Sequence, residues 1–219
     1  VVARLDGFLT GPSADDADAI VLDYVRAQET VFGLDDDDLR GLRLVRDETD
    51  AFGVRHLLWA QEAGGIRAVA NDLRASVTAD GRILNVLGSP IPDLELPADG
   101  AAVSGGEAVA ATFRHAGRAM AAPRALNAPR GAARTTRFTG GHGASLVLVA
   151  TGRGVKLAWR VTTDVDSDEV YTSLVDATSG EVLASVNKVE DVDATGEAWE
   201  YYPGAASGGT AALANWTAA

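Results

Sequence analysis

The chain has 219 residues, of which 47% are hydrophobic and 23% are charged, so it can bury at least one core and is not a disordered tail. It contains no cysteine, which excludes disulfides, a thiol nucleophile and Cys-ligated zinc or iron–sulfur sites. Its net charge of -12 opposes general binding to nucleic acid, and no apolar run reaches the ~20 residues that a membrane helix needs.

The first predicted element is a helix at residues 14–32. Ser13 is a good N-cap, and Gly33 follows the last apolar residue of the helical period. The first 38 residues hold ten acids and two arginines, so most of the net negative charge lies in this segment. The four aspartates at 35–38 are interpreted as a solvated turn that leaves the helix.

An antiparallel meander is predicted next. Strands are expected at residues 42–48, 54–61, 66–78 and 82–87, separated by short turns that contain Asp or Gly. Leu73, Ala75 and Val77 alternate with polar residues, so one face of that strand should meet a core. Residues 88–100 contain three prolines and are interpreted as a linker.

The second half repeats this plan. A helix is predicted at about residues 106–120, entered by Ser104, and an irregular loop at 123–137. Strands are predicted at 145–150, 155–163, 169–176 and 181–188. The sequence therefore predicts an α+β fold of two modules, each a helix packed on a curled antiparallel β-sheet. The expected boundaries are 1–100, 101–190 and a final segment 191–219.

Charge also divides the chain into blocks. Residues 108–163 contain no acid, and residues 164–200 contain eleven acids against Lys188 alone. Such blocks more often form solvated faces that attract one another within a fold than a ligand site. The alternative is a basic surface for an acidic partner. Nine cations belong to the basic block: Arg114, Arg118, Arg124, Arg130, Arg134, Arg137, Arg153, Lys156 and Arg160.

Candidate reaction centres are few and weak. The zinc-peptidase string His-Glu-x-x-His and the elbow Gly-x-Ser-x-Gly are absent, and no Ser-His-Asp order can be argued. His56 is interpreted as a structural strand residue and His115 as a helix-surface or core-edge residue. His142 is expected to be more exposed, where it could ligate a metal only adventitiously and not as a functional ligand. The run 164–169 lacks the glycine and final glutamate of a calcium loop, which favours an acidic hairpin. On these residues alone the prediction is a non-catalytic α+β binding protein.

Several short motifs occur together between residues 50 and 90. They are Gly53-Val54-Arg55-His56, Trp59-Ala60-Gln61, Gly65-Ile66, and Asp80-Gly81-Arg82 followed by Gly88. In this order they closely resemble the FTP module found in the pro-regions of fungalysin and thermolysin-type secreted zinc metallopeptidases.

Two further segments carry related likenesses. Leu157-Ala158-Trp159 and the run 171–183 make residues 105–188 similar to the PepSY or cystatin-like module that follows FTP in those pro-regions. The runs 200–205 and 208–210 resemble the opening of the bacterial fungalysin catalytic chain. The likeness therefore extends over nearly the whole sequence.

This resemblance implies a role as a pro-region and argues against a catalytic role for this chain. Pro-regions of this kind act as an intramolecular chaperone and as a cis inhibitor until they are removed by proteolysis. The expected partner is the chain's own metallopeptidase catalytic domain. Neither nucleic acid nor a membrane is expected to be a partner. The family's zinc ligands and general base lie downstream, so no catalytic residue and no cofactor is expected in this chain. Zinc, with calcium as a second candidate, is expected in the downstream domain. Secretion is also implied, with the signal peptide absent from this chain.

Two surfaces follow as hypotheses from this role. The processing junction is placed in the acidic segment that leaves the last strand: Asp191, Val192, Asp193, Ala194, Thr195, Gly196 and Glu197. The basic surface that faces an acidic protease is assigned to Arg134, Arg137, Arg153, Lys156 and Arg160, and inhibition should then depend strongly on salt.

Two other functions stay open at this point. A stand-alone extracytoplasmic peptide-binding or protease-inhibiting protein would share every module, and a stop codon after Ala219 would favour it. An enzyme would require an unrecognised metal or carboxylate site, and metal-dependent turnover by the purified chain would reveal it. An encoded His-Glu-x-x-His downstream would instead favour the pro-region.

Overall fold

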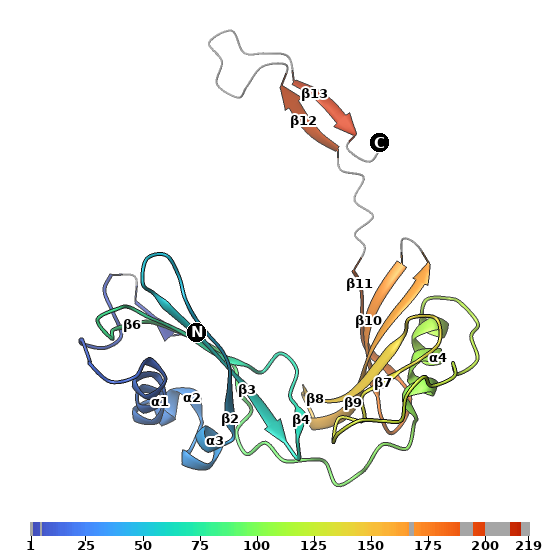
Figure 1. The fold of residues 1–219 in the computed structure, drawn as a ribbon, viewed down its shortest axis with the longest axis horizontal. Helices are drawn as coiled ribbons and strands as arrows, with labels where there is room; N and C mark the ends of the chain where they lie inside the picture. Colours follow the sequence, from blue (N-terminus) through green and yellow to red (C-terminus); the bar gives the residue numbers. More distant parts are fainter. Residues whose placement is uncertain (1, 5, 167–168, 189–194, 200–210, 216–219) are drawn as a thin grey trace.

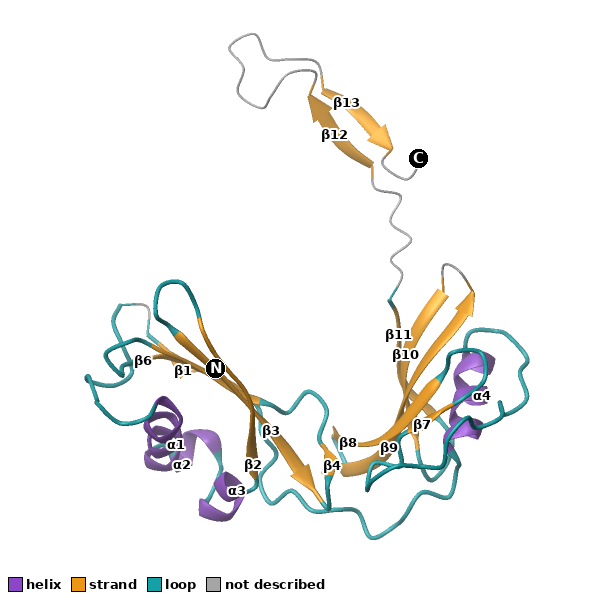
Figure 2. Ribbon diagram, viewed as in Figure 1, coloured by secondary structure: helices purple, strands orange, loops and turns teal. Residues whose placement is uncertain are grey.

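The computed structural model describes residues 2–4, 6–166, 169–188, 195–199 and 211–215. The chain forms two α+β modules, the first with three short helices and the second with one helix on an antiparallel sheet (Figures 1 and 2), which confirms the predicted fold class. The first sheet has the order β1-β6-β5-β3-β2, with β4 paired to β3, and the second has the order β11-β10-β9-β8-β7. A two-stranded hairpin, β12 (Thr195–Trp199) with β13 (Ala211–Asn215), follows.

The first module builds its core between short helices and one sheet face. Val21, Val25, Trp59, Leu73 and Ile83 are all at most 1% exposed in this core. Because β2, β3, β5 and β6 are neighbours in chain order, the predicted meander is confirmed. The elements of this module are α1 (Ala17–Ala27), α2 (Glu29–Phe32), α3 (Asp36–Arg40), β1 (Val2–Ala3), β2 (Leu42–Thr49), β3 (Arg55–Ala63), β4 (Ile66–Arg67), β5 (Leu73–Val77) and β6 (Ile83–Gly88).

The predicted single helix at 14–32 is wrong in its continuity. It is divided at Gln28, whose φ of -113° and ψ of 35° lie outside the helical region. Asp16, and not Ser13, is the N-cap residue of α1. The 3.6-residue period could not reveal the break, because apolar residues on both sides of Gln28 keep to the same face.

The four aspartates begin a further helix instead of an exposed turn. Asp35 Oδ1 accepts hydrogen bonds from the backbone N–H groups of Asp37 and Asp38 at 2.8 and 2.9 Å. Asp38 Oδ2 in turn accepts from the Asp35 N–H at 3.3 Å, which completes a capping box for α3. The box uses an aspartate in the place of the usual glutamate, so the motif was missed.

The predicted strand at 66–78 is broken as well. β4 ends at Arg67 and β5 begins at Leu73, and between them Ala70 has a φ of 65°, in the left-handed region. This excursion takes the chain out of the first sheet and toward the second module. An unbroken apolar and polar alternation could not predict that departure.

The second module places one helix on a five-stranded sheet. Its elements are α4 (Gly105–His115), β7 (Thr136–Arg137), β8 (Gly143–Thr151), β9 (Gly154–Asp166), β10 (Glu169–Asp176) and β11 (Val182–Asn187). Ser104 caps α4 as predicted, with the Ser104 hydroxyl and the Glu107 carboxylate forming a reciprocal capping box. The helix ends five residues before the predicted end at Met120.

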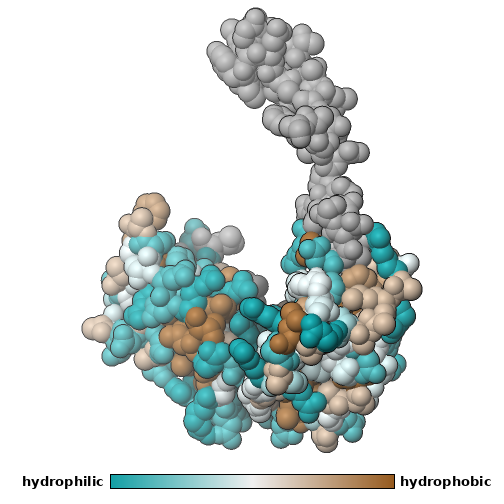
Figure 3. Space-filling view, turned by 45° about the vertical axis from the view of Figure 1, so that its right-hand side comes forward, coloured by the Kyte–Doolittle hydropathy of each residue, from teal (hydrophilic) through white to brown (hydrophobic). Residues whose placement is uncertain are grey.

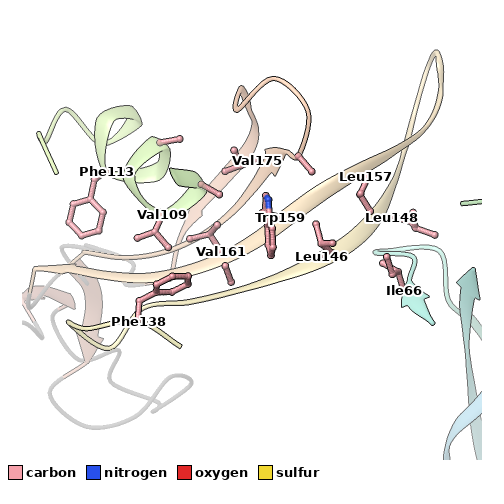
Figure 4. Packing of buried hydrophobic residues seen from close by; sticks show 14 of the residues in the cluster. Ile66, Val109, Phe113, Phe138, Leu146, Leu148, Leu157, Trp159, Val161 and Val175 are labelled. Atoms are coloured by element: carbon pink, nitrogen blue, oxygen red, sulfur yellow. The ribbon is translucent and has the colours of Figure 1, made fainter. Parts of the chain in front are cut away.

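The core of this module lies between α4 and the sheet. Val109 and Phe113 of the helix meet Trp159, Val161 and Val175 of the strands (Figure 4). The alternation predicted for β9 is confirmed, because Leu157, Trp159 and Val161 are all at most 6% exposed. The opposite face of β9 therefore points away from α4.

The two modules share a joint built from the β4 excursion. The Val69 N–H donates to the Leu148 carbonyl at 2.9 Å, and Ala68 forms a parallel bridge with Leu148. Ile66 and Ala68, at 4% and 0% exposure, belong to the core of the second module, where Figure 4 shows Ile66 close to Leu148. Residues of the first module thus complete the second core.

The connecting segment 89–104 is anchored as well. The side-chain amide of Gln61, in β3, donates to the Ile91 carbonyl at 2.7 Å, and its oxygen accepts from the Ile91 N–H at 2.6 Å. Ile91 and Leu94 then pack on the second core. Gln61 is 3% exposed, and these two bonds satisfy its buried amide.

Candidate partner-binding surface

Each sheet has one face without a helix, and these faces are the candidate surface. In the view of Figure 1, α1–α3 lie on the outer side of the first sheet and α4 on the outer side of the second. A space-filling view shows an apolar patch enclosed by hydrophilic residues on the first module (Figure 3).

A row of alternating cations and leucines crosses the helix-free face of the first sheet. Arg46 pairs in register with Leu58, Leu58 with Arg74, and Arg74 with Leu87. Arg46 and Arg74 are exposed, while Leu58 and Leu87 are partly exposed. Together with His56, Ser76 and Asn85, these residues line a groove of about 330 Å³.

Both arginines are largely available to a partner. Arg74 has no ion pair or side-chain hydrogen bond with any described residue. Arg46 Nε lies 3.7 Å from Glu48 Oε1, and both side chains are more than half exposed, so this pair is weak. Both cations were missed at the sequence level, although period-two alternation along β5 puts Arg74 on the face opposite Leu73 and Ala75.

A hydrogen-bonded line of three polar side chains runs beside this row. His56 Nε2 lies 3.2 Å from Asp50 Oδ2, and His56 Nδ1 lies 3.1 Å from Ser76 Oγ. The Val54 N–H, the His56 ring and the Phe52 N–H lower the pKa of Asp50 against the effect of its burial. The predicted structural role of His56 is supported by these bonds, although its side chain is 48% exposed.

The line resembles a Ser-His-Asp array without the rest of a hydrolytic centre. Ser76 lies in the middle of β5, whose neighbours β3 and β6 pair with it on both sides. Because β5 has a paired strand on each side, its backbone N–H groups point along the sheet toward those strands and not toward the Ser76 side chain, as an oxyanion hole would require. Its chemistry is that of a hydrogen-bonded surface network, which holds His56 beside the groove.

The five predicted basic residues fall at separate places on the second module. Arg160 lies on the helix-free face of β9, Arg153 in the β8–β9 turn, and Arg134 and Arg137 in and beside β7. Lys156 Nζ instead pairs with Asp176 Oδ2 at 2.7 Å. The structure therefore does not gather the five into one cluster.

The ion pair between Lys156 and Asp176 has a structural role, because the Asp176 carboxylate is buried. Burial raises the pKa of Asp176, but hydrogen bonds from Lys156 and from the Ser179 and Thr178 N–H groups outweigh that effect and hold the pKa below its usual value. The Asp176 side chain is 6% exposed. Lys156 thus neutralises a buried carboxylate and is not a free cation.

Arg160 faces a groove between the modules, with a volume of about 460 Å³. The other charged groups in its walls are paired: Arg43 with Glu62, and Arg67 with Asp72 at 2.9 Å. Arg160 has no ion pair within the described part of the chain. Arg160 is therefore the cation in this groove that is available to pair with a carboxylate of a partner.

The segment predicted as an irregular loop at 123–137 is held by backbone hydrogen bonds. The Leu126 N–H donates to the Arg137 carbonyl at 2.8 Å, and Arg130 and Thr135 exchange two bonds. Leu126, Arg130 and Arg137 then line a groove of about 480 Å³ with Asn127 and Thr135. The prolines obscured this pairing because it is too short to show a strand period.

His142 is buried, so the expectation of an exposed adventitious ligand is wrong. The residue is 5% exposed, its ring meets Phe113 edge-on at 5.2 Å, and its Nδ1 has no partner in the described structure. Burial lowers its pKa, and the charge of Asp164 offsets this in part. Flanking glycines suggested a loop, but the ring turns back beneath α4. His115 is exposed, which agrees with its predicted place.

We expect His142 to make the second module less stable in mild acid. Because the folded-state pKa is depressed, the unfolded chain binds the proton more readily as pH falls below about 6.5. Stability should then decline by no more than about 1.4 kcal/mol per pH unit for this one proton. In urea unfolding between pH 7.5 and 5.5, His142→Phe should flatten this decline and His115→Gln should leave it unchanged. Equal slopes for all three proteins would contradict the assignment.

The hypothesised processing junction is covered only in part by the described residues. Asp191, Val192, Asp193 and Ala194 lie outside them. Thr195, Gly196 and Glu197 lie in β12, where they pair with Asn215, Ala214 and Leu213 of β13. The junction therefore stays a prediction.

Within the described residues, no group of three or more His, Asp or Glu side chains is placed to hold a metal ion. The same residues include no helix that is long and apolar enough to cross a membrane.

Residues 40–90 match the family described as Fungalysin/Thermolysin Propeptide Motif. This span contains strands β2–β6 and hence the row of arginines and leucines. Among solved structures, the chain is similar to the Bacillus megaterium YpeB C-terminal domain, with 9% identity, a TM-score of 0.37, and coverage of 83% of this chain and 69% of that chain. So distant a likeness carries no functional argument. The comparison with curated proteins found no match. The chain thus carries a propeptide motif, which is a non-catalytic one.

Proposed function

We propose that this chain is the pro-region of a secreted zinc metalloendopeptidase, acting as intramolecular chaperone and cis inhibitor of the catalytic domain until proteolytic removal. The observation that carries the proposal is the propeptide motif at residues 40–90. In the structure this motif forms the sheet whose helix-free face is open to a partner.

Inhibition in cis needs only a modest interface. A covalently attached domain meets its target at an effective concentration that can reach about millimolar, so the cleft is kept occupied before processing. After cleavage, dilution weakens the complex. Arg134, Arg137, Arg153 and Arg160 lie at separate places on the second module, and each is proposed to meet acidic groups of the catalytic domain, whereas Lys156 is already neutralised by Asp176.

Chaperoning needs a template for the protease chain. β2 and β11 are edge strands of the two sheets, and edge strands expose backbone donors and acceptors to a pairing segment. Such pairing would lower the folding barrier of a protease that is kinetically trapped without its pro-region.

The decisive experiment refolds the catalytic domain encoded in the same reading frame with and without this chain. The proposal expects active protease only when the chain is present during refolding, and inhibition when the chain is added afterwards. Equal recovery of activity in both samples, together with no inhibition, would reject it. Inhibition of unrelated proteases alone would favour the stand-alone inhibitor.

We expect Arg160→Gln to weaken inhibition in trans by about threefold at low salt, because one charge pair at a partly exposed site contributes up to about 1 kcal/mol. The variant should also show a shallower dependence of the inhibition constant on salt concentration. Arg114→Gln, at the exposed end of α4 and away from the groove, is the matched control and should behave like the parent. Inhibition that is indifferent to salt in all three proteins would remove the electrostatic part of the proposal.

A further inference from the structure

We propose that the helix-free face of the first sheet binds an acidic amphipathic helix of a protein partner. The binding surface is the row formed by Arg46, Leu58, Arg74 and Leu87. This proposal goes beyond the pro-region role because it specifies the secondary structure and the chemistry of the bound segment. Among the described residues, the helices α1–α3 lie on the other face of this sheet (Figure 1).

Charge complementarity gives the sign of the partner. The chain as a whole carries a net charge of -12, yet this face carries Arg46 on the edge strand β2 and Arg74 on the inner strand β5. Two acids contact side chains of this surface: Glu48 lies 3.7 Å from Arg46, and Asp50 is hydrogen-bonded to His56. Neither acid contacts Arg74. Arg74 is therefore able to pair with a carboxylate of a binding partner.

The apolar part of the partner is set by two leucines. Leu58 and Leu87 are partly exposed on either side of Arg74, whereas the residues beneath them on the other face, such as Leu57 and Val86, are at most 2% exposed. An apolar side chain placed between two carboxylates would cover each leucine. The partner should thus alternate acidic and apolar groups at the repeat of the row.

The repeat decides between a helix and an extended strand. Neighbouring strands lie about 4.8 Å apart, so Arg46 and Arg74, two strands apart, are separated by about 9.6 Å along the row. In an α-helix, residues i and i+7 are about 10.5 Å apart on one face, with i+3 and i+4 halfway between them. In an extended strand, side chains on one face repeat every ~6.7 Å. If the first of them lay over Arg46, the next would fall between Leu58 and Arg74 and contact neither of them directly. The spacing therefore fits a helix better.

The test uses the whole chain and a synthetic probe. The probe is a fluorescein-labelled 18-residue peptide with Glu at positions 2, 9 and 16, Leu at positions 5, 6, 12 and 13, and Ala and Gln elsewhere. A second peptide of the same composition alternates Glu and Leu every second residue. Fluorescence anisotropy at 50 and 500 mM salt measures binding, and amide chemical shifts of the protein locate it.

We expect the helical probe to bind with saturable anisotropy and to shift the amides of β3, β5 and β6. Arg74→Gln should weaken binding about threefold and the double variant Arg46→Gln/Arg74→Gln about tenfold, since exposed charge pairs contribute up to about 1 kcal/mol each. Arg74→Lys should restore most of the affinity, and Leu58→Ser should weaken it without changing its salt dependence. Arg114→Gln should match the parent.

Three results would overturn the proposal. They are equal binding of the alternating peptide, binding that ignores both arginines, and tighter Arg74-dependent binding of anionic vesicles or single-stranded DNA than of the probe. Thermal unfolding of each variant checks that it is folded. The probe contains no protease sequence, so this outcome and the refolding experiment can fail separately.

Discussion

Replacing Gly81 by alanine should destabilise the first module by about 3 kcal/mol. Gly81 has a φ of 79°, which an L-residue adopts only with strain, and it lies in the turn between β5 and β6. A methyl group there would stand 2.1 Å from the Ser13 carbonyl oxygen and 2.9 Å from its carbon. Both clashing atoms are backbone, so no rotamer change can relieve them, and the segment leading into α1 must move.

Urea unfolding followed by far-UV circular dichroism measures this effect. Gly152→Ala is the matched control, because an added methyl group there meets no atom within 4 Å and the φ is not in the left-handed region. The control should stay within about 0.5 kcal/mol of the parent protein. If both variants unfold at the same urea concentration, the close approach between Gly81 and Ser13 does not exist in solution.

The largest loss in the second module is expected for Trp159→Ala, at about 4 kcal/mol. The indole is 3% exposed and lies in the sheet face that α4 covers (Figure 4). It fits against the helix start, since a methyl group on Gly105 would come within 3.3 Å of the ring. Removing it leaves a cavity that a sheet and a capped helix cannot close.

A second variant separates packing from hydrogen bonding at this site. Trp159 Nε1 donates to the Val103 carbonyl at 2.8 Å, just before the Ser104 cap. Trp159→Phe keeps most of the apolar volume but removes this donor, so it should cost about 1–2 kcal/mol. If Trp159→Phe proves as damaging as Trp159→Ala in thermal and urea unfolding, the bond to Val103 is more important than the cavity.

Strands with one buried face were predictable because their side chains alternate. β9 and β5 show this directly, and the capping box of α4 is equally local: Ser104 and Glu107 stand three residues apart. Where the prediction failed, a single residue changed the path of the chain without changing the pattern. Gln28 divides a helix and Ala70 ends a strand, and neither residue type signals that by itself.

The candidate surface was predictable only in part, because partners across a sheet are distant in sequence. The basic block includes Arg160, which the structure places at a groove, but the sequence could not show that Asp176, twenty residues later, would neutralise Lys156. Arg46 and Arg74 lie in a module whose sequence is acidic overall, and only the strand register brings them into one row with the leucines. His142 was misplaced for the same reason, since Phe113 on α4 buries it.

Because residues of the first module complete the core of the second, cleavage of one peptide bond between β3 and β4 would destabilise both modules. The β3–β4 turn at Gly64 and Gly65 is exposed, while Ile66 and Ala68, directly after it, are buried in the neighbouring module. A nick in this turn would free the segment that completes the second core and, through β3, loosen the first sheet. Proteolytic removal of the chain at this turn would then affect both modules at once.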